Sequence, residues 1–244
     1  MWKTRTYSAT EEISIDQKNF LGLTVMLLLA LNFTLSYLAF TYYPNGLLDA
    51  QSPGFWITAA NYSLITGIVV LNKKIIGWQW SDLGLGRIKS WWKTVVVGMA
   101  VFTLLLLFSQ YIQPHIFDAF GQQHNVSHLS ALEGDLPRLI GTLIFVWITA
   151  GLLEELVFRA FLINTLDVLL GSTIWSTMAA VIISSLIFGM VHSYQGVTGI
   201  LVTTCIGLIF GVAYVLGGRK IWPLIFIHGH IDTITLISFY RGTF

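Results

Sequence analysis

Long apolar runs without charged residues recur along the whole chain, and short polar segments separate them. The first run, Phe20 to Tyr43, is 24 residues long, and about 20 helical residues are enough to cross the hydrocarbon core of a bilayer. The later runs are Phe55 to Leu71, Thr94 to Tyr111, a run opening at Pro137, Ile174 to Val191, Gly199 to Leu216 and Ile221 to Tyr240. This pattern predicts an all-α fold, a polytopic membrane helix bundle of about seven transmembrane helices.

The polar segments predict the division of the chain. Residues 1–19 form a polar tail, and residues 20–244 form a single membrane-embedded domain without internal repeats or long linkers. The first run ends in Tyr42 and Tyr43, followed by Pro-Asn-Gly. An interfacial aromatic pair before a turn is typical of a retained membrane helix and not of a cleaved signal peptide.

The Lys and Arg residues are concentrated in some of the polar segments. Three lie in the tail, five lie between residues 72 and 93 and two lie in the 217–220 turn, whereas the 44–54, 112–136 and 192–198 segments have none. Cytoplasmic loops of membrane proteins are enriched in these residues. We therefore expect an integral membrane protein with its amino terminus in the cytoplasm. The tryptophan-rich 78–92 segment predicts an amphipathic element in the headgroup zone.

Composition excludes several other classes of protein. Hydrophobic residues make up 55% of the chain and charged residues only 10%, against about 25% charged in soluble domains. The net charge of +1 provides no basic field, so no nucleic-acid partner is expected. A single cysteine, Cys205, allows neither a disulfide framework nor a cysteine-based metal site.

Three clusters of ionisable residues interrupt the apolar second half of the chain. An ionisable group inside a membrane costs several kcal/mol unless it is paired, hydrated or neutralised, so a functional site is the default hypothesis. Apart from Asp167 and the 219–220 turn, the residues concerned are Glu154, Glu155, Arg159, His192, His228, His230 and Asp232.

In the first cluster, Glu155 and Arg159 are spaced i,i+4 and are expected to form an ion pair on one helix face. Glu154 points about 100° away from them. It has no obvious partner within its own helix, as a general base for water requires. The alternative interpretation is that the three charges mark a helix end at the interface.

The three clusters can form one site only if the histidines lie at the same depth in the membrane as Glu154. Counted from the turn at Gly171, Glu154 lies 17 residues before it and His192 lies 21 after it, so the two are level within roughly 6 Å. His228 and Asp232 share a helix face at i,i+4. They reach the same depth only if the 160–171 end projects beyond the 217–220 turn.

Together the clusters read Glu-Glu-x-x-Phe-Arg at 154–159, Phe-x-x-x-His at 188–192 and His-x-x-x-Asp at 228–232. In this order they resemble the CAAX prenyl protease and bacteriocin-processing (Abi) family of intramembrane endopeptidases, over a catalytic core of about 138–240.

The resemblance implies a role for each matched residue. Glu154 would activate the hydrolytic water, and His192 would hold that water or relay its proton. His228 would donate to the oxyanion with assistance from Asp232, while Glu155 and Arg159 would orient their helix. The implied substrate is a membrane-associated peptide or protein in the lipid bilayer, as in bacteriocin or signal-peptide maturation or CAAX-type processing. The sequence indicates no oligomeric state.

Asp232 departs from the family pattern. The CAAX-processing members typically have Asn at this position, whereas Asp232 donates a hydrogen bond only when it is protonated and otherwise can only orient His228. Small membrane-associated peptides are therefore favoured over prenylated CAAX substrates.

Three alternatives stay open. Two histidines and one glutamate could bind zinc, although water activation by Glu154 needs no metal and we expect no cofactor. A non-catalytic immunity or accessory protein could bind a peptide toxin without cutting it. An ion-coupled transporter is less favoured, because the chain lacks a repeat between its halves.

Overall fold

The computed structural model describes residues 13–43, 47, 49–123 and 125–243. Within these ranges the chain is helical and contains no strand. The helices are α1 (Ile15–Tyr42), α2 (Pro53–Ile76), α3 (Trp91–Tyr111), α4 (Gln113–Phe120), η1 (Ser127–Leu132), α5 (Leu136–Val146), η2 (Trp147–Ile163), α6 (Asn164–Leu169), α7 (Ile174–Val191), η3 (Ser193–Gln195), α8 (Gly196–Leu216) and α9 (Trp222–Tyr240). The all-α prediction is confirmed.

Each of the seven predicted runs is helical in the structure. In the described part of the chain, six helical segments are long and apolar enough to cross a membrane. The seventh run, α9, falls outside that set because His228, His230 and Asp232 lower its mean hydropathy. The run opening at Pro137 is one continuous helix formed by α5, η2 and α6, in which η2 has π-helical hydrogen bonding.

The first helix begins within the segment predicted as a polar tail. The α1 helix begins at Ile15, where the side chains of Ser14 and Gln17 cap the backbone reciprocally. This capping box satisfies amide groups that the first turn leaves unpaired, so the helix starts five residues before the apolar run. Residues 1–12 of the tail lie outside the described residues.

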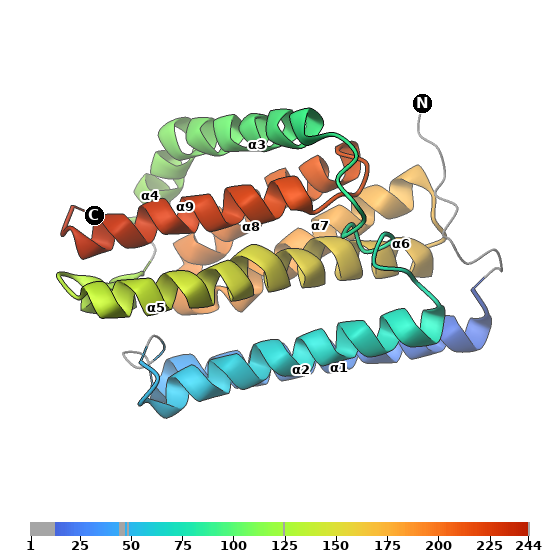
Figure 1. Cartoon of the computed structure of the whole chain (residues 1–244), viewed down its shortest axis with the longest axis horizontal. Helices are drawn as coiled ribbons and strands as arrows, with labels where there is room; N and C mark the ends of the chain where they lie inside the picture. The colour runs from blue at the N-terminus through green and yellow to red at the C-terminus, as the bar shows by residue number, and fades with distance from the viewer. Residues whose placement is uncertain (1–12, 44–46, 48, 124, 244) are drawn as a thin grey trace.

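Two antiparallel helix pairs form much of the bundle. Helices α1 and α2 form one hairpin at its side (Figure 1), and α7 and α8 form another. Gly207 and Gly211 on α8 allow the second pair to pack closely, since a Cβ at these positions would lie 3.2 Å from Ser185 Cα and 2.9 Å from Val181 Cγ1, respectively. The GxxxG motif therefore packs within the bundle.

The loops divide between the two ends of the bundle as the Lys and Arg pattern predicted. Figure 1 shows the 77–90 connection and the start of α9 at one end, with α4, the α1–α2 connection and the carboxyl terminus at the other. We call the first the basic end. Which end faces the cytoplasm stays a prediction.

Two features of the basic end were not predicted. Arg219, assigned to a turn, also bonds to the bundle: its guanidinium lies 2.7 Å from Asp167 Oδ2 and donates to Asn164 Oδ1. In the 78–92 segment, Trp78 and Leu83 are buried in the core, whereas Trp80, Trp91 and Trp92 are exposed. Tertiary contacts, invisible to helix periodicity, account for both.

Candidate active site

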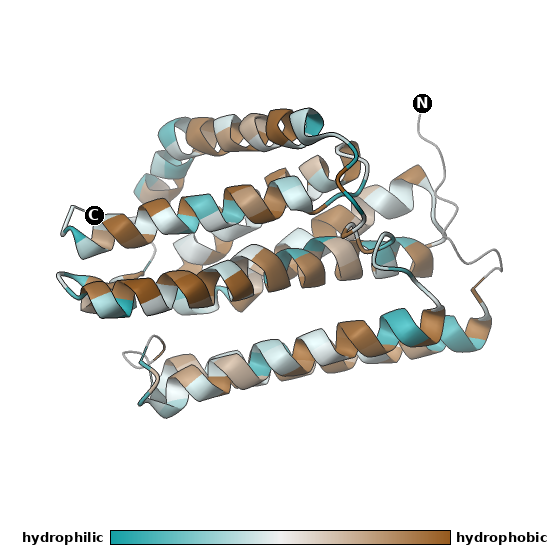
Figure 2. Cartoon of the chain, viewed as in Figure 1, coloured by the Kyte–Doolittle hydropathy of each residue, from teal (hydrophilic) through white to brown (hydrophobic). Residues whose placement is uncertain are grey.

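The four residues expected to be catalytic line one cavity of about 560 Å³. Glu154 comes from η2 and His192 from the C-cap of α7, while His228 and Asp232 come from α9. His228 and Asp232 therefore reach the same depth in the bundle as Glu154, a point that the sequence left open. Figure 2 shows a hydrophilic stretch at the middle of α9, with apolar residues on either side of it in the same helix.

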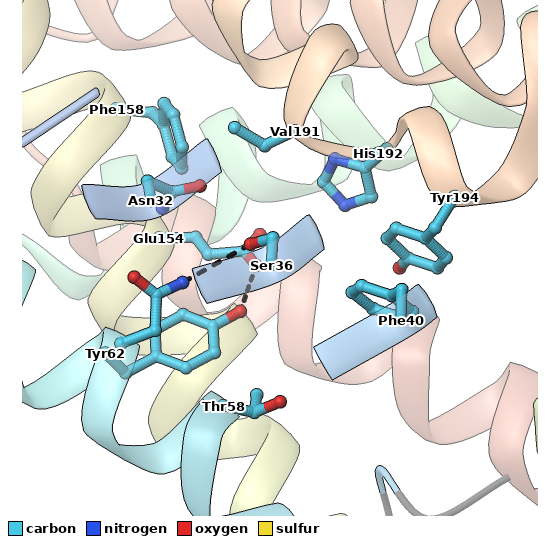
Figure 3. Close-up of a pocket in the computed structure, with 11 residues that line it drawn as sticks. Asn32, Ser36, Phe40, Thr58, Tyr62, Glu154, Phe158, Val191, His192 and Tyr194 are labelled. Atoms are coloured by element: carbon cyan, nitrogen blue, oxygen red, sulfur yellow. Dashed lines mark hydrogen bonds between the residues drawn. The ribbon is translucent and has the colours of Figure 1, made fainter. Parts of the chain in front are cut away.

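Glu154 has a partner that its own helix does not provide. Its side chain is buried, and its Oε1 accepts a hydrogen bond of 2.6 Å from the Tyr62 hydroxyl of α2 (Figure 3). The expectation concerned partners within the same helix, and the structure adds a partner from another helix. The bond fixes one carboxylate oxygen, and the other lies 4.0 Å from His228 Nε2.

Glu155 contacts two cations or potential cations at once. Its Oε1 lies 3.1 Å from Arg159 Nη1 and 2.8 Å from His228 Nδ1. The expected Glu155–Arg159 pair is present and fully buried. The Arg159 guanidinium also lies over the rings of Phe188 and Phe210, 4.2 and 5.1 Å from their centroids, an arrangement in which the ring faces attract the charge.

Glu155, and not Asp232, holds the Nδ1 of His228. Asp232 Oδ2 lies 3.7 Å from the opposite nitrogen, Nε2. Three carboxylates therefore lie within 4.0 Å of one imidazole, which favours its protonated form. In that form both ring nitrogens are hydrogen-bond donors.

His192 is oriented by its own helix. Its Nδ1 lies 2.7 Å from the Phe188 carbonyl oxygen, and because a carbonyl only accepts, Nδ1 carries a proton. Nε2 is then the nitrogen able to exchange a proton with a molecule in the cavity. His230 points away from the site, as expected, since it is exposed and its Nδ1 contacts the Phe226 carbonyl.

A glycine between the two histidines of α9 brings this helix close to η2. A Cβ on Gly229 would lie 2.7 Å from the indole of Trp147, whose Nε1 donates to Thr233. The absence of a side chain at 229 therefore permits the approach of His228 to the glutamates of η2.

An aromatic cluster closes one wall of the cavity at the end opposite the basic loops. Phe40 stacks on Tyr194 with ring centroids 3.6 Å apart, and the His128 ring meets both edge-on. Burial lowers the pKa of His128 to about 4. His128 is therefore neutral at physiological pH and adds no charge to this wall.

Several polar residues of the amino-terminal hairpin were missed in the sequence. Their signal is helical spacing within uncharged runs: Asn32 and Ser36 are i,i+4 on α1, and Thr58, Asn61 and Tyr62 are i, i+3 and i+4 on α2. Polar groups sharing one face of a membrane helix point to the bundle interior.

The arrangement does not fit a zinc ion as it stands. Structural and catalytic zinc sites use at least three protein ligands. Nowhere in the described ranges do three His, Cys, Asp or Glu side chains form a group that could hold a metal. Metal independence itself stays a prediction.

Fold and site together define a polytopic membrane protein with carboxylates and histidines gathered inside its helix bundle. Residues 136–234 match the family described as Rce1-like, type II CAAX prenyl endopeptidase. In this segment the chain is similar to the CAAX prenyl protease and bacteriocin-processing family, the family that the three motifs indicated.

A curated relative matches part of the chain and adds no activity. The chain is 31% identical over 105 residues to an "Uncharacterized 24.3 kDa protein" of Escherichia coli, an alignment covering 43% of this chain. The chain spans about half (46%) of that relative's length. No solved structure matches the chain significantly.

Proposed function

We propose that the protein is an intramembrane endopeptidase that cleaves a membrane-associated peptide with a water molecule activated by Glu154. The observation that carries the proposal is the meeting of Glu154, His192, His228 and Asp232 in one buried cavity. The match of residues 136–234 to the family model supports the reaction class.

In this mechanism Glu154 removes a proton from water while the water oxygen bonds to the scissile carbonyl carbon. The Nε2–H of protonated His228 donates to the resulting oxyanion, a stabilisation available only if the donor is already in place. Glu154 then gives its proton to the amide nitrogen as the C–N bond breaks. His192 holds the attacking water through Nε2, and the products are a carboxylic acid and an amine.

The lining of the cavity indicates an uncharged apolar substrate segment. Much of the wall is apolar, including Leu105, Phe108, Val202, Ile206, Phe210 and Leu236. Among the described residues that line it there is no Lys or Arg, whereas Glu154 and Asp232 are both present. Apart from His228, which the mechanism assigns to the oxyanion, the lining offers a free carboxylate no basic partner such as Lys or Arg, which favours cleavage within a peptide over recognition of a carboxyl terminus.

The position of the cavity in the bundle indicates on which side of the membrane the substrate is cleaved. Gln113, Val126, His128 and Gln195 line it, and all of them lie in segments at the end opposite the basic loops. With the orientation expected from Lys and Arg, that end is outside the cytoplasm. We therefore favour maturation of an exported bacteriocin or signal-type peptide over cytoplasmic CAAX processing.

The test compares peptides secreted or retained by cells producing the wild type or Glu154→Gln. The variant keeps the volume of the side chain but removes the base, so cleavage by purified protein of the peptide found should fall by roughly 10²- to 10⁴-fold. Thermal unfolding in detergent should be unchanged. Identical peptide patterns from both strains would favour a binding or accessory protein.

The metal dependence of the proposed reaction is tested by measuring cleavage of the same peptide by purified protein with and without a chelator. Activity should survive prolonged chelation, because Glu154 and the histidines need no metal for acid–base chemistry. Loss of activity that added zinc restores would establish the zinc-dependent alternative.

A further inference from the structure

A second and smaller cavity of about 70 Å³ adjoins Glu154. Its walls come from α1, α2, η2 and the end of α7 (Figure 3). Glu154, Tyr62, His192 and Tyr194 line both cavities, whereas Asn32, Ser36 and Asn61 line only the smaller one. We call this smaller space the hairpin chamber, since the α1–α2 hairpin supplies its polar wall.

The hairpin chamber contains buried polar atoms with unused hydrogen-bonding capacity. Asn32 and Asn61 are each 5% exposed, and the side-chain oxygen of each has no hydrogen-bond partner among the described residues. The amide nitrogen of Asn61 donates weakly to Ser36 Oγ at 3.4 Å. Buried acceptors are rarely left unpaired in native proteins, so they require a ligand that donates hydrogen bonds.

The size of the chamber decides which donor fits. A buried water molecule needs about 10 to 15 Å³ of cavity volume and two to four polar partners. The chamber therefore accommodates a few water molecules, while the eightfold larger cavity beside it provides room for a peptide. Water is scarce in the hydrocarbon core, so a hydrolytic site at this depth benefits from a local supply.

We propose that the hairpin chamber is a water-binding site from which Glu154 draws the water it activates, an inference that rests on the proposed hydrolytic function. Asn32 and Asn61 accept hydrogen bonds from the bound waters, and Tyr62 holds the carboxylate at the boundary between chamber and substrate cavity. Helices α1 and α2 lie outside the matched segment 136–234. The proposal gives this part of the chain a role in the reaction.

Radiolytic hydroxyl labelling in detergent tests the water site without requiring proteolysis. Radicals formed from bound water label adjacent side chains, so Tyr62 and Phe158 in the chamber wall should be labelled in the wild type. Asn32→Leu with Asn61→Leu removes both acceptors at similar volume, and labelling at these two positions should fall several-fold. Unchanged labelling in this variant would overturn the proposal.

Two matched variants control for folding and for general polarity. Thr34→Leu with Ser63→Leu places the same residue on exposed faces of the same two helices and should leave the labelling unchanged. Asn32→Ser with Asn61→Ser keeps acceptors in the chamber and should label at least as strongly as the wild type. If the leucine double variant does not fold, Asn32→Leu alone is measured against Thr34→Leu alone.

Kinetics separates water supply from substrate binding. Since Asn32 and Asn61 do not line the larger cavity, the leucine variants should lower kcat by roughly tenfold, comparable to one lost hydrogen bond, and leave KM unchanged. A raised KM with normal kcat would instead make the chamber part of the substrate site and overturn the proposal. Strong labelling in a wild type without peptidase activity would refute the hydrolytic function alone.

Discussion

The Nδ1 atom of His228 lies 2.8 Å from Oε1 of Glu155, while its Nε2 lies 3.7 Å from Asp232 Oδ2. The ring is therefore held on one side by a fully buried carboxylate, and its other nitrogen faces the cavity that Glu154 lines. This arrangement gives Glu155 the orienting role that the sequence assigned to Asp232 in its ionised form.

Substitution at these two positions should have unequal effects. Asp232→Asn leaves the Glu155–His228 contact intact and supplies a neutral donor, so we expect peptidase activity within about tenfold of the wild type. Glu155→Gln removes the charge that orients His228 and pairs with Arg159, and should lower both activity and folded yield. A much larger loss in Asp232→Asn than in Glu155→Gln would contradict this assignment.

The hydrogen bond from Tyr62 to Glu154 predicts that the amino-terminal hairpin is needed for full activity. Tyr62→Phe removes only the hydroxyl, and kcat should fall by roughly tenfold because the carboxylate loses a charge-assisted donor. Tyr37→Phe, on an exposed face of α1, provides the matched control. Wild-type kcat in Tyr62→Phe would show that Glu154 is positioned by other groups.

The buried pair of Arg159 and Glu155 predicts a stability effect. Removing one partner leaves an uncompensated buried charge, at a cost on the order of 3 to 5 kcal/mol, and Arg159→Ala also loses the stacking on Phe188 and Phe210. Folded yield and melting temperature in detergent should fall sharply. Arg138→Ala is the control, since Arg138 pairs with Asp135 at the exposed surface; equal stability of the two variants would contradict a structural role.

The distribution of basic residues predicts the topology. Reporter fusions at residues 80 and 218 should be cytoplasmic, and a fusion at 125 should be external. An external reporter at 80 would reverse the orientation. It would also place the cavity toward the cytoplasm and weaken the case for exported peptides.

Much of the architecture follows from periodicity and from the cost of charge in an apolar run. Every predicted apolar run is a helix, and α7 has the predicted limits of Ile174 and Val191. The three motif clusters were found because each charged or imidazole side chain stands out among apolar neighbours. Glu155 and Arg159 were correctly paired because their contact is local, at i,i+4.

The parts of the site that escaped prediction depend on contacts between distant segments. Tyr62 and Glu154 are 92 residues apart, and tyrosine within a membrane helix is not by itself unusual. Arg219 and Asp167 were likewise set apart from the clusters without being paired, although they form one ion pair. Helix spacing identifies faces but does not state which faces meet.

The two ends of the bundle are held together by different kinds of contact. At the basic end, Arg219 joins α6 and α7 through Asp167, Asn164 and Thr177. At the opposite end, the α1–α2 hairpin meets the cavity wall through the stacked rings of Phe40 and Tyr194, which are uncharged. For the proposed endopeptidase, we therefore expect the peptide to enter between these rings and not at the end where Arg219 joins the helices.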